Sequence, residues 1–470
     1  MKVDTIIVGA GTAGLTALRE VRGFTEDFLL VNGGRWGTTC AAVGCMPSKA
    51  LIEVANAFHR RRAFDDFGIR GADTLRLDLP AALAHVRKLR DGFVAGPESV
   101  RDELGPRAIS GRARLTGPNR IEVNGAEIEA RAIILATGSR PVVPKAWEAF
   151  GERVLTSDTL FEQHDLPRRI AVVGMGAIGV EIAQALARFG LDVAGFDALD
   201  GLAGIQDPAV LASFRPLIER EFRLHLGAPA QLSPSAGRVR VEGAGGGFEA
   251  DAVLAAIGRR PNIDGLGLET LGVALDSRGM PEIDPTTLRL GDTSVFLAGD
   301  ANLFRPLMHE AADEGHIAGR NAAPDVATVR HCRRTPLGIV FSSPQVARVG
   351  AGLAEIPDAR CAIGEYDFSR QARARMAATA AGLMRLYGDR ETGALLGAEM
   401  CVPAAEHLAH LLALAIERKL TASDMLAMPF YHPVLEEGLR SALRDLAKDL
   451  PPGGQSDLAR CGPIGHEALD

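Results

Sequence analysis

Two glycine-rich turns restrict the folds open to this 470-residue chain more than any other feature. The turn at residues 9–14 follows the apolar run 5–8, and the turn at residues 174–179 follows the apolar run 170–173. Each has the spacing Gly-x-Gly-x-x-Gly before a helical stretch, and two such strand–turn–helix units predict two Rossmann-like dinucleotide-binding domains in an α/β fold. In each motif the first glycine makes the turn, the second admits a pyrophosphate and the third packs helix on strand. The glycines concerned are Gly9, Gly11, Gly14, Gly174, Gly176 and Gly179.

The residue that ends the second strand of each unit indicates which nucleotide binds. Asp197 stands 21 positions after Gly176, and a carboxylate there accepts a hydrogen bond from a ribose 2′-hydroxyl and repels a 2′-phosphate. Ala198 and Leu199 follow, with no arginine to hold that phosphate, so the second unit favours NAD over NADP. The equivalent residue of the first unit is Asn32, which can hydrogen-bond a ribose but carries no charge.

The last third of the chain has a different pattern. Residues 337–349, 360–368 and 383–400 read as strands of an antiparallel sheet, with a hairpin turn at 389–393. An amphipathic helix is expected over 404–418. Strands followed by helices predict a separate C-terminal α+β domain.

Composition limits the classes of protein to which the chain can belong. Its 52 basic and 59 acidic residues give a net charge of −7, which argues against a nucleic-acid partner. No run of about 18 apolar residues occurs, so no membrane span and no membrane partner are expected. The first residues do not resemble a secretory signal, and six cysteines are too few for a disulfide scaffold, so a cytoplasmic enzyme is expected.

Two cysteines lie close together at a predicted helix entry. Cys40 and Cys45 precede a helix expected from about Pro47 onward. A helix N-terminus lowers the pKa of a thiol and favours redox exchange. The alternatives are a zinc half-site and a pair of buried core thiols. Zinc would need a second ligand pair, and no metal site is expected because the other cysteines are scattered singly, at Cys332, Cys361, Cys401 and Cys461.

Together these segments resemble the pyridine nucleotide-disulfide oxidoreductases, and most closely the dihydrolipoamide dehydrogenases among them. The resemblance runs from Val3 to about Leu450. It rests on both glycine turns and on residues 40–49, 136–141, 257–262, 297–300 and 432–437. It implies an FAD-binding domain with a redox disulfide at 1–147, an NAD-binding domain at 148–265, a segment completing the FAD domain at 266–330, a dimerisation domain at 331–450 and a flexible tail at 451–470.

The resemblance also assigns nucleotide contacts. The first glycine turn would hold FAD and the second NAD(P)H. Asp300 would bind the ribityl or pyrophosphate part of FAD, and Thr39 resembles a flavin-contacting threonine. Further residues implied to contact a nucleotide are Asn32, Lys49, Ala113, Thr137, Gly138, Leu307, Met308 and His309 for FAD, and Gly258 at a strand end.

For catalysis the resemblance implies a redox disulfide beside the flavin. Cys45 would be the thiol that contacts the flavin and Cys40 the thiol that exchanges with substrate. Lys49, one helical turn beyond Cys45, would lie by the flavin ring and pair with Glu181. A cation there would stabilise negative charge on the reduced flavin.

A C-terminal segment would supply the acid and base. His432 resembles the family histidine that deprotonates a dithiol and protonates a leaving thiol. A glutamate five positions on would orient its ring, which by spacing is Glu437, with Glu436 as the rival. Val434 replaces the usual threonine, and Asn32, Trp36, Thr38 and Ala42 also depart from close relatives, around the flavin and the disulfide.

The expected activity is NAD-dependent oxidation of protein-bound dihydrolipoyl groups by a homodimer. The partner would be a lipoyl-bearing carrier protein or a 2-oxoacid dehydrogenase complex. The alternative is another disulfide or metal-ion reductase of the family, similar to the glutathione or mercuric reductases. A noncatalytic binder on this scaffold would have lost one of Cys40, Cys45, His432 and Glu437, and none is lost.

Overall fold

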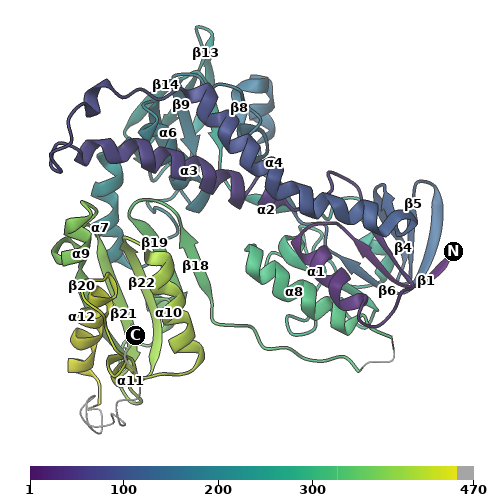
Figure 1. The fold of residues 1–470 in the computed structure, drawn as a ribbon. Helices are drawn as coiled ribbons and strands as arrows, with labels where there is room; N and C mark the ends of the chain where they lie inside the picture. Colours follow the sequence, from purple (N-terminus) through teal and green to yellow (C-terminus); the bar gives the residue numbers. More distant parts are fainter. Residues whose placement is uncertain (325–326, 452–470) are drawn as a thin grey trace. The chain divides into compact units, whose positions relative to one another are not determined.

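The computed structural model describes residues 1–324 and 327–451, so the expected tail lies outside the described residues after Pro451. The chain forms two compact units (Figure 1). The first unit contains residues 1–53, 78–166 and 257–333, and the second contains residues 54–77, 167–256 and the described chain from Arg334 onward. Both units are therefore assembled from separate segments of sequence.

The first unit is built on a sheet in which β1 is central. β1 pairs in parallel with β2 and β6, β2 pairs in parallel with β3, and β17 pairs in parallel with β6. The antiparallel strands β5 and β4 continue the sheet beyond β6. The bounds are β1 Lys2–Val8, β2 Phe28–Asn32, β3 Ala108–Ser110, β4 Ala113–Gly117, β5 Arg120–Val123, β6 Ala126–Leu135 and β17 Val295–Leu297.

Two helices of the first unit pack against each other through glycines. α1 (Thr12–Val21) and α8 (Met308–Asn321) lie side by side (Figure 1). A Cβ atom at Gly315 would lie 2.3 Å from the backbone oxygen of Ala13, and one at Gly319 would lie 2.9 Å from that of Ala17. Only glycine permits so close an approach, which fixes α8 against the helix that begins at the first glycine turn. The remaining long helix of this unit is α4 (Leu79–Leu104).

The second unit contains the second Rossmann-like domain. Strands β11, β10, β9 and β15 run parallel in that order, and α6 connects β9 to β10. An antiparallel sheet of β12, β13 and β14 is inserted before β15. The bounds are β9 Arg169–Val173, α6 Ala177–Arg188, β10 Asp192–Asp197, α7 Pro208–Glu219, β11 Arg223–Leu226, β12 Gln231–Ser235, β13 Arg238–Gly243, β14 Gly246–Ala250 and β15 Ala252–Ala255.

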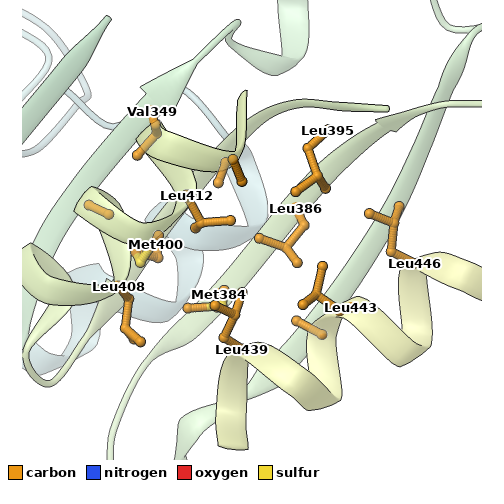
Figure 2. Close-up of a cluster of buried hydrophobic side chains, with 14 of the residues drawn as sticks. Val349, Met384, Leu386, Leu395, Met400, Leu408, Leu412, Leu439, Leu443 and Leu446 are labelled. Carbon is orange, nitrogen blue, oxygen red and sulfur yellow. The ribbon is translucent and has the colours of Figure 1, made fainter. Parts of the chain in front are cut away.

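The C-terminal part of the second unit is an antiparallel sheet in the order β18-β19-β22-β21-β20. Helices α10 and α12 cover it, and Figure 2 shows Leu408 and Leu412 of α10 and Leu439 and Leu443 of α12 facing the strands. Burial of these side chains is the main force holding the helices on the sheet. The bounds are β18 Leu337–Val340, β19 Gln345–Gly350, β20 Cys361–Asp367, α9 Ala372–Met376, β21 Leu383–Asp389, β22 Leu395–Val402, α10 Ala405–Glu417, α11 Ala422–Leu426 and α12 Glu436–Leu446.

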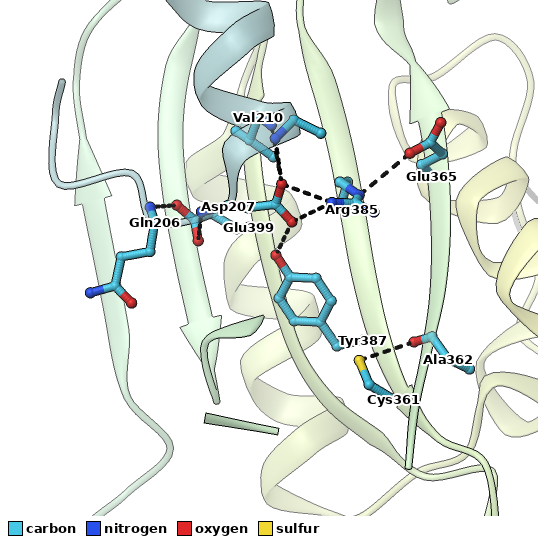
Figure 3. A network of polar contacts seen from close by, with 10 residues as sticks. Gln206, Asp207, Val210, Cys361, Ala362, Glu365, Arg385, Tyr387 and Glu399 are labelled. Carbon is cyan, nitrogen blue, oxygen red and sulfur yellow. Dashed lines mark hydrogen bonds and ion pairs between the residues drawn. The ribbon is translucent and has the colours of Figure 1, made fainter. Parts of the chain in front are cut away.

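Within the second unit, a buried polar network joins the start of α7 to the C-terminal sheet (Figure 3). Asp207, fully buried, accepts two hydrogen bonds from Arg385 Nη1, at 2.8 Å each, and one from the Tyr387 hydroxyl at 2.8 Å. Glu399 of β22 is also fully buried and accepts from the backbone N–H groups of Gln206 and Asp207. The loop before α7 is thereby tied to β21 and β22.

The expected fold class is confirmed, with two Rossmann-like domains and a C-terminal α+β domain. The hairpin at 389–393 and the helix over 404–418 are also present, as the β21–β22 turn and α10. The helix expected from Pro47 begins earlier, at Cys45, because Ser48 N–H already donates to the carbonyl of Gly44.

Candidate active site

The first glycine turn has the geometry of a phosphate cradle. Gly9 has a φ of +112°, and a Cβ atom there would lie 2.2 Å from the backbone oxygen of Ala136. A Cβ atom at Gly14 would lie 1.9 Å from the backbone oxygen of Gly9, whereas nothing lies within 4 Å of one at Gly11. Backbone atoms therefore pack tightly against Gly9 and Gly14, whereas the space beside Gly11, where α1 begins, is open. Open space at a helix N-terminus fits a pyrophosphate.

The second glycine turn repeats this geometry. Gly174 has a φ of +98°, and a Cβ atom at Gly179 would lie 1.7 Å from the backbone oxygen of Gly174. Gly176 again faces open space at the start of α6. The residues present thus fit a dinucleotide at each of the two turns.

The strand-end residues are directed at the backbone of these turns. Asn32 Oδ1 accepts from Ala10 N–H at 3.2 Å, and Asp197 Oδ2 accepts from Met175 N–H at 2.6 Å. Asp197 Oδ1 also accepts from Leu199 N–H at 2.9 Å. The amide and the carboxylate therefore occupy equivalent places in the two halves, and only the second carries charge.

Asp300 lies in a short helical turn after β17 and faces Ser139. The Ser139 hydroxyl donates to Asp300 Oδ2 at 2.7 Å and accepts from Arg259 Nε at 2.8 Å. The Thr137 hydroxyl nearby in sequence is buried and has no hydrogen-bond partner among the described residues. A buried hydroxyl without a partner is costly, so this atom suits a ligand contact.

The other sequence-derived nucleotide residues lie as follows. Leu307, Met308 and His309 are exposed at the start of α8, and Ala113 opens β4, half-buried against the core of the first unit. Gly138 and Gly258 both have positive φ, and Thr39 is the first residue of α2. The roles of these residues toward a nucleotide stay predictions.

The cysteine pair spans two helices. Cys40 lies in the single-turn helix α2 (Thr39–Ala42), which the Thr38 hydroxyl caps, and Cys45 is the first residue of α3 (Cys45–His59). Both are thiols here. A hydrogen bond with the Cys45 side chain, together with burial, raises the pKa of the Cys40 thiol despite the opposing charge of Lys49. The direction of the pKa shift at Cys40 is therefore opposite to the lowering expected for the cysteine pair, because the contact with the Cys45 side chain and burial outweigh the backbone hydrogen bond from Cys45 and the charge of Lys49.

Lys49 and Glu181 fall in different units of the structure, so their pairing stays a prediction. Glu181 is buried on α6, and its Oε1 accepts from the backbone N–H of Phe341 at 2.7 Å. This contact joins α6 to the loop after β18, and no local sequence pattern predicts it.

His432 and Glu437 form a hydrogen-bonded pair before and within α12. His432 Nδ1 lies 3.0 Å from Glu437 Oε1, and Glu437 Oε2 accepts from Val434 N–H at 3.2 Å. The hydrogen bond from His432 holds the pKa of Glu437 below its usual value. An ionised Glu437 assigns the proton to Nδ1 and leaves Nε2 as the base. The glutamate that contacts His432 is thus Glu437 and not Glu436. The hydrogen bond from position 434 comes from the backbone N–H, so it forms with valine as well as it would with threonine.

A cavity of about 280 Å³ lies beside this pair. Pro433, Val434 and Glu436 form one side of it, and Arg373 and His407 also line it. The His432 side chain itself is 75% exposed, so within one chain the imidazole stands in solvent.

The described residues include no group of three or more histidine, cysteine, aspartate or glutamate side chains arranged to hold a metal ion. In the same part of the chain, no helix combines the length and the apolar character that crossing a membrane requires.

Comparison with known proteins agrees with this geometry over nearly the whole chain. A relative from Thermus scotoductus, a dihydrolipoyl dehydrogenase, is 33% identical over 95% of this chain and 97% of its own. The dihydrolipoyl dehydrogenase 3 of Pseudomonas aeruginosa is 30% identical over 94% and 97%. LpdA from Mycobacterium tuberculosis, a solved structure, is 26% identical with a TM-score of 0.82 over 94% of this chain and 99% of its own.

A second solved structure shares the fold at lower identity. RclA from Escherichia coli, described as an HOCl-induced flavoprotein disulfide reductase, is 22% identical with a TM-score of 0.81 over 95% of this chain and 99% of its own. The model of the family named pyridine nucleotide-disulphide oxidoreductase matches residues 3–315, and the model of its dimerisation domain matches residues 337–443. The chain belongs to the pyridine nucleotide-disulphide oxidoreductase family.

Proposed function

We propose that the protein is an FAD-containing dihydrolipoyl dehydrogenase that uses NAD⁺, works as a homodimer and oxidises lipoyl groups carried by a partner protein or a 2-oxoacid dehydrogenase complex. The observation that carries this proposal is the His432–Glu437 pair in a chain that also brings Cys40 and Cys45 into contact. A disulfide that exchanges with a dithiol needs a base to make the attacking thiolate, and this pair supplies one.

The proposed reaction is an exchange between the two thiols of the substrate and the Cys40–Cys45 disulfide. His432 Nε2 takes a proton from one substrate thiol, the resulting thiolate attacks Cys40, and the bond to Cys45 breaks so that Cys45 leaves as the thiolate. His432 then gives that proton to Cys40 as the second substrate sulfur attacks the first and displaces Cys40, and takes the proton of the second thiol, so the substrate leaves as a disulfide and both cysteines are reduced. FAD bound at the first glycine turn would supply the two-electron link from this dithiol to NAD⁺ at the second turn.

Glu437 and Lys49 would support this exchange without entering it. Glu437 holds the Nδ1 proton of His432 and so fixes the tautomer in which Nε2 is the base. Lys49 acts on the Cys40 thiol through its charge, in the direction that favours the thiolate. Both groups bias proton positions toward the reactive forms.

The choice of NAD⁺ rests on the surroundings of Asp197. Its carboxylate would face the 2′ position of a nucleotide bound at the second glycine turn and would repel a 2′-phosphate. Arg215 donates to the side chain and carbonyl of Asp200, three residues after Asp197. A site with the Asp197 carboxylate in place favours NAD⁺.

Steady-state assays with four substrate pairs test the proposal. We expect dihydrolipoamide with NAD⁺ to give the highest kcat/KM, well above dihydrolipoamide with NADP⁺, oxidised glutathione with NADPH, and Hg²⁺ with NADPH. Faster turnover of glutathione or of Hg²⁺ would assign the chain to another branch of the family and overturn the proposal.

Replacing Asp197 by serine should weaken the preference for NAD⁺ over NADP⁺ by about 10- to 100-fold, because a charged hydrogen bond to the ribose and the repulsion of a phosphate are lost together. The ratio of kcat/KM for NAD⁺ to kcat/KM for NADP⁺ measures this preference. Asp192→Asn, at the other end of β10, removes a carboxylate that pairs with Arg223 and should leave the ratio unchanged. An unchanged ratio in Asp197→Ser would contradict the assignment.

Replacing His432 by glutamine should lower kcat for dihydrolipoamide by about 100- to 10,000-fold, the usual contribution of a general base. NADH oxidation by a small quinone, which does not need the thiols, should stay within about twofold of the wild-type rate. Glu437→Gln should show a smaller loss of the same kind, since the base remains but its tautomer is no longer held. Equal losses in both assays would indicate damage to the fold and not to the base.

A further inference from the structure

Two buried glutamates on α8 face the loop that carries Asp300. Glu310 is 3% exposed and Glu314 is 1% exposed, and they lie one helical turn apart. Arg333 places a guanidinium nitrogen 2.8 Å from Glu314 and another 3.6 Å from Glu310. Arg305 donates to Glu310 at 2.8 Å. Both carboxylates therefore have cations beside them, which a buried charge requires.

The second oxygen of Glu314 bridges the two sides of Asp300. Glu314 Oε2 accepts from the backbone N–H of Gly299 at 2.6 Å and from the side-chain amide of Asn302 at 2.6 Å. Gly299 has a φ of +73°, a conformation that few other residues adopt, so this turn is unusual and needs support. One carboxylate oxygen thus fixes the residue before Asp300 and the second residue after it.

The hydrogen bonds of Asp300 leave one of its carboxylate oxygens available to bind a ligand. Its Oδ2 accepts from Ser139, and its Oδ1 has no hydrogen-bond partner within the described residues. α8 is set firmly against α1 through Gly315, which follows Glu314 directly. Glu314 therefore connects Asp300 to the helix that starts at the first glycine turn.

Packing alone does not explain why residue 314 is a carboxylate and not a neutral side chain of the same size. Burial raises the pKa of Glu314, while the charge of Arg333 and the hydrogen bonds from Gly299 and Asn302 oppose that rise. A neutral amide would fill the same space without the cost of desolvation. The carboxylate differs from the amide in its charge, which strengthens the bonds of Oε2 to the turn and lets Oε1 form the ion pair with Arg333 at 2.8 Å.

We propose that Glu314 is a positioning residue for the flavin: it holds the 299–302 turn so that Asp300 faces the bound FAD, and Arg333 keeps Glu314 in place as an acceptor. This inference rests on the FAD component of the proposed function. Glu314 would thus contribute to FAD affinity, and not only to folding, without having to contact FAD.

The test is the dissociation constant of FAD from the Glu314→Gln holoenzyme, followed by the flavin fluorescence that appears on release. We expect it to rise about 10- to 100-fold, since the bonds of a charged acceptor to the turn are weakened. Amide hydrogen exchange of the peptide that contains Gly299 should become faster in the same variant. Glu20→Gln is the matched control, because Glu20 pairs with His316 of α8 at 2.9 Å and does not touch the turn.

The outcomes separate the inference from the function on which it rests. A wild-type protein that binds no FAD refutes the proposed function. A wild-type protein that binds FAD, with Glu314→Gln within twofold of it and unchanged exchange at Gly299, refutes the inference alone. If Glu314→Gln does not fold, Arg333→Met decides, because it removes the cation that holds Glu314 as a charged acceptor and so weakens both bonds to the turn. Unchanged FAD affinity in Arg333→Met then refutes the inference, and a weakened affinity supports it.

Discussion

Replacing Cys45 by serine should lower dihydrolipoamide oxidation by at least about 1,000-fold, because no disulfide can then form with Cys40 and a hydroxyl cannot replace a thiol in the exchange. Cys40→Ser should cause a loss of the same size. Both variants should still oxidise NADH with a small quinone, since that reaction does not need the dithiol. Initial rates in the two assays, measured on the same preparation, give the comparison.

Cys332→Ser is the matched control for this pair. Cys332 is an exposed thiol in the first unit, away in sequence from residues 40–49, so its loss should leave both rates unchanged. Cys45→Ser with unimpaired dithiol oxidation would refute the proposed mechanism.

Replacing Arg385 by methionine should lower the free energy of unfolding by about 3–5 kcal/mol, because Asp207 would remain as a buried charge without its cation. Asp207→Ala should have an effect of similar size, since it removes the same pair and exposes the N–H groups at the start of α7. Denaturant unfolding of the variants, compared at matched protein concentration, measures the change.

Arg370→Met is the control for the arginine variant. Arg370 forms an exposed ion pair with Asp367 at 3.9 Å, and its loss should cost about 1 kcal/mol or less. A cost for Arg385→Met no larger than for Arg370→Met would mean that the network in Figure 3 does not stabilise the fold.

The same network sets a pH dependence of stability. Burial opposes ionisation of Asp207, but the bonds from Arg385 and Tyr387 outweigh it and hold its pKa below the usual value. The stabilisation is therefore present above the pKa of an unfolded aspartate, near 3.9, and is lost as the pH falls below it. The difference between wild type and Asp207→Ala should accordingly shrink in acid. Glu399 acts in the opposite direction, because burial raises its pKa and its contribution declines as the pH rises.

The parts of the fold that sequence predicts are those with local signals. The glycine turns, the hairpin before Ala394 and the helix α10 each follow from a short pattern, and each lies where the pattern places it. The start of α3 was misplaced by two residues because the pattern emphasised Pro47, while the first helical hydrogen bond comes from the carbonyl of Gly44. Boundaries depend on such single bonds, which the sequence does not display.

The contacts of the candidate site are predictable where they depend on the spacing of residues close in sequence. They are not predictable where residues from distant segments come together. Glu436 and Glu437 are adjacent, and only the direction of the first turn of α12 decides which faces His432. The raised pKa of Cys40 depends on a sulfur–sulfur contact and on burial. The link from Glu314 to Gly299 and to Arg333 joins three separated segments. The one available signal was two glutamates, Glu310 and Glu314, at helical spacing on one face of α8.

The exposure of His432 bears on how the enzyme should respond to dilution. An imidazole that is 75% exposed in a single chain has no enclosed pocket in which to exchange protons with a substrate. If a second copy supplies that enclosure, as the match to a dimerisation domain supports, each active site needs two chains. Specific activity would then depend on protein concentration, falling as the subunits separate, although every chain stays folded. A mixture of Cys45→Ser chains with His432→Gln chains should regain activity by forming hybrids, in which one of the two sites is intact.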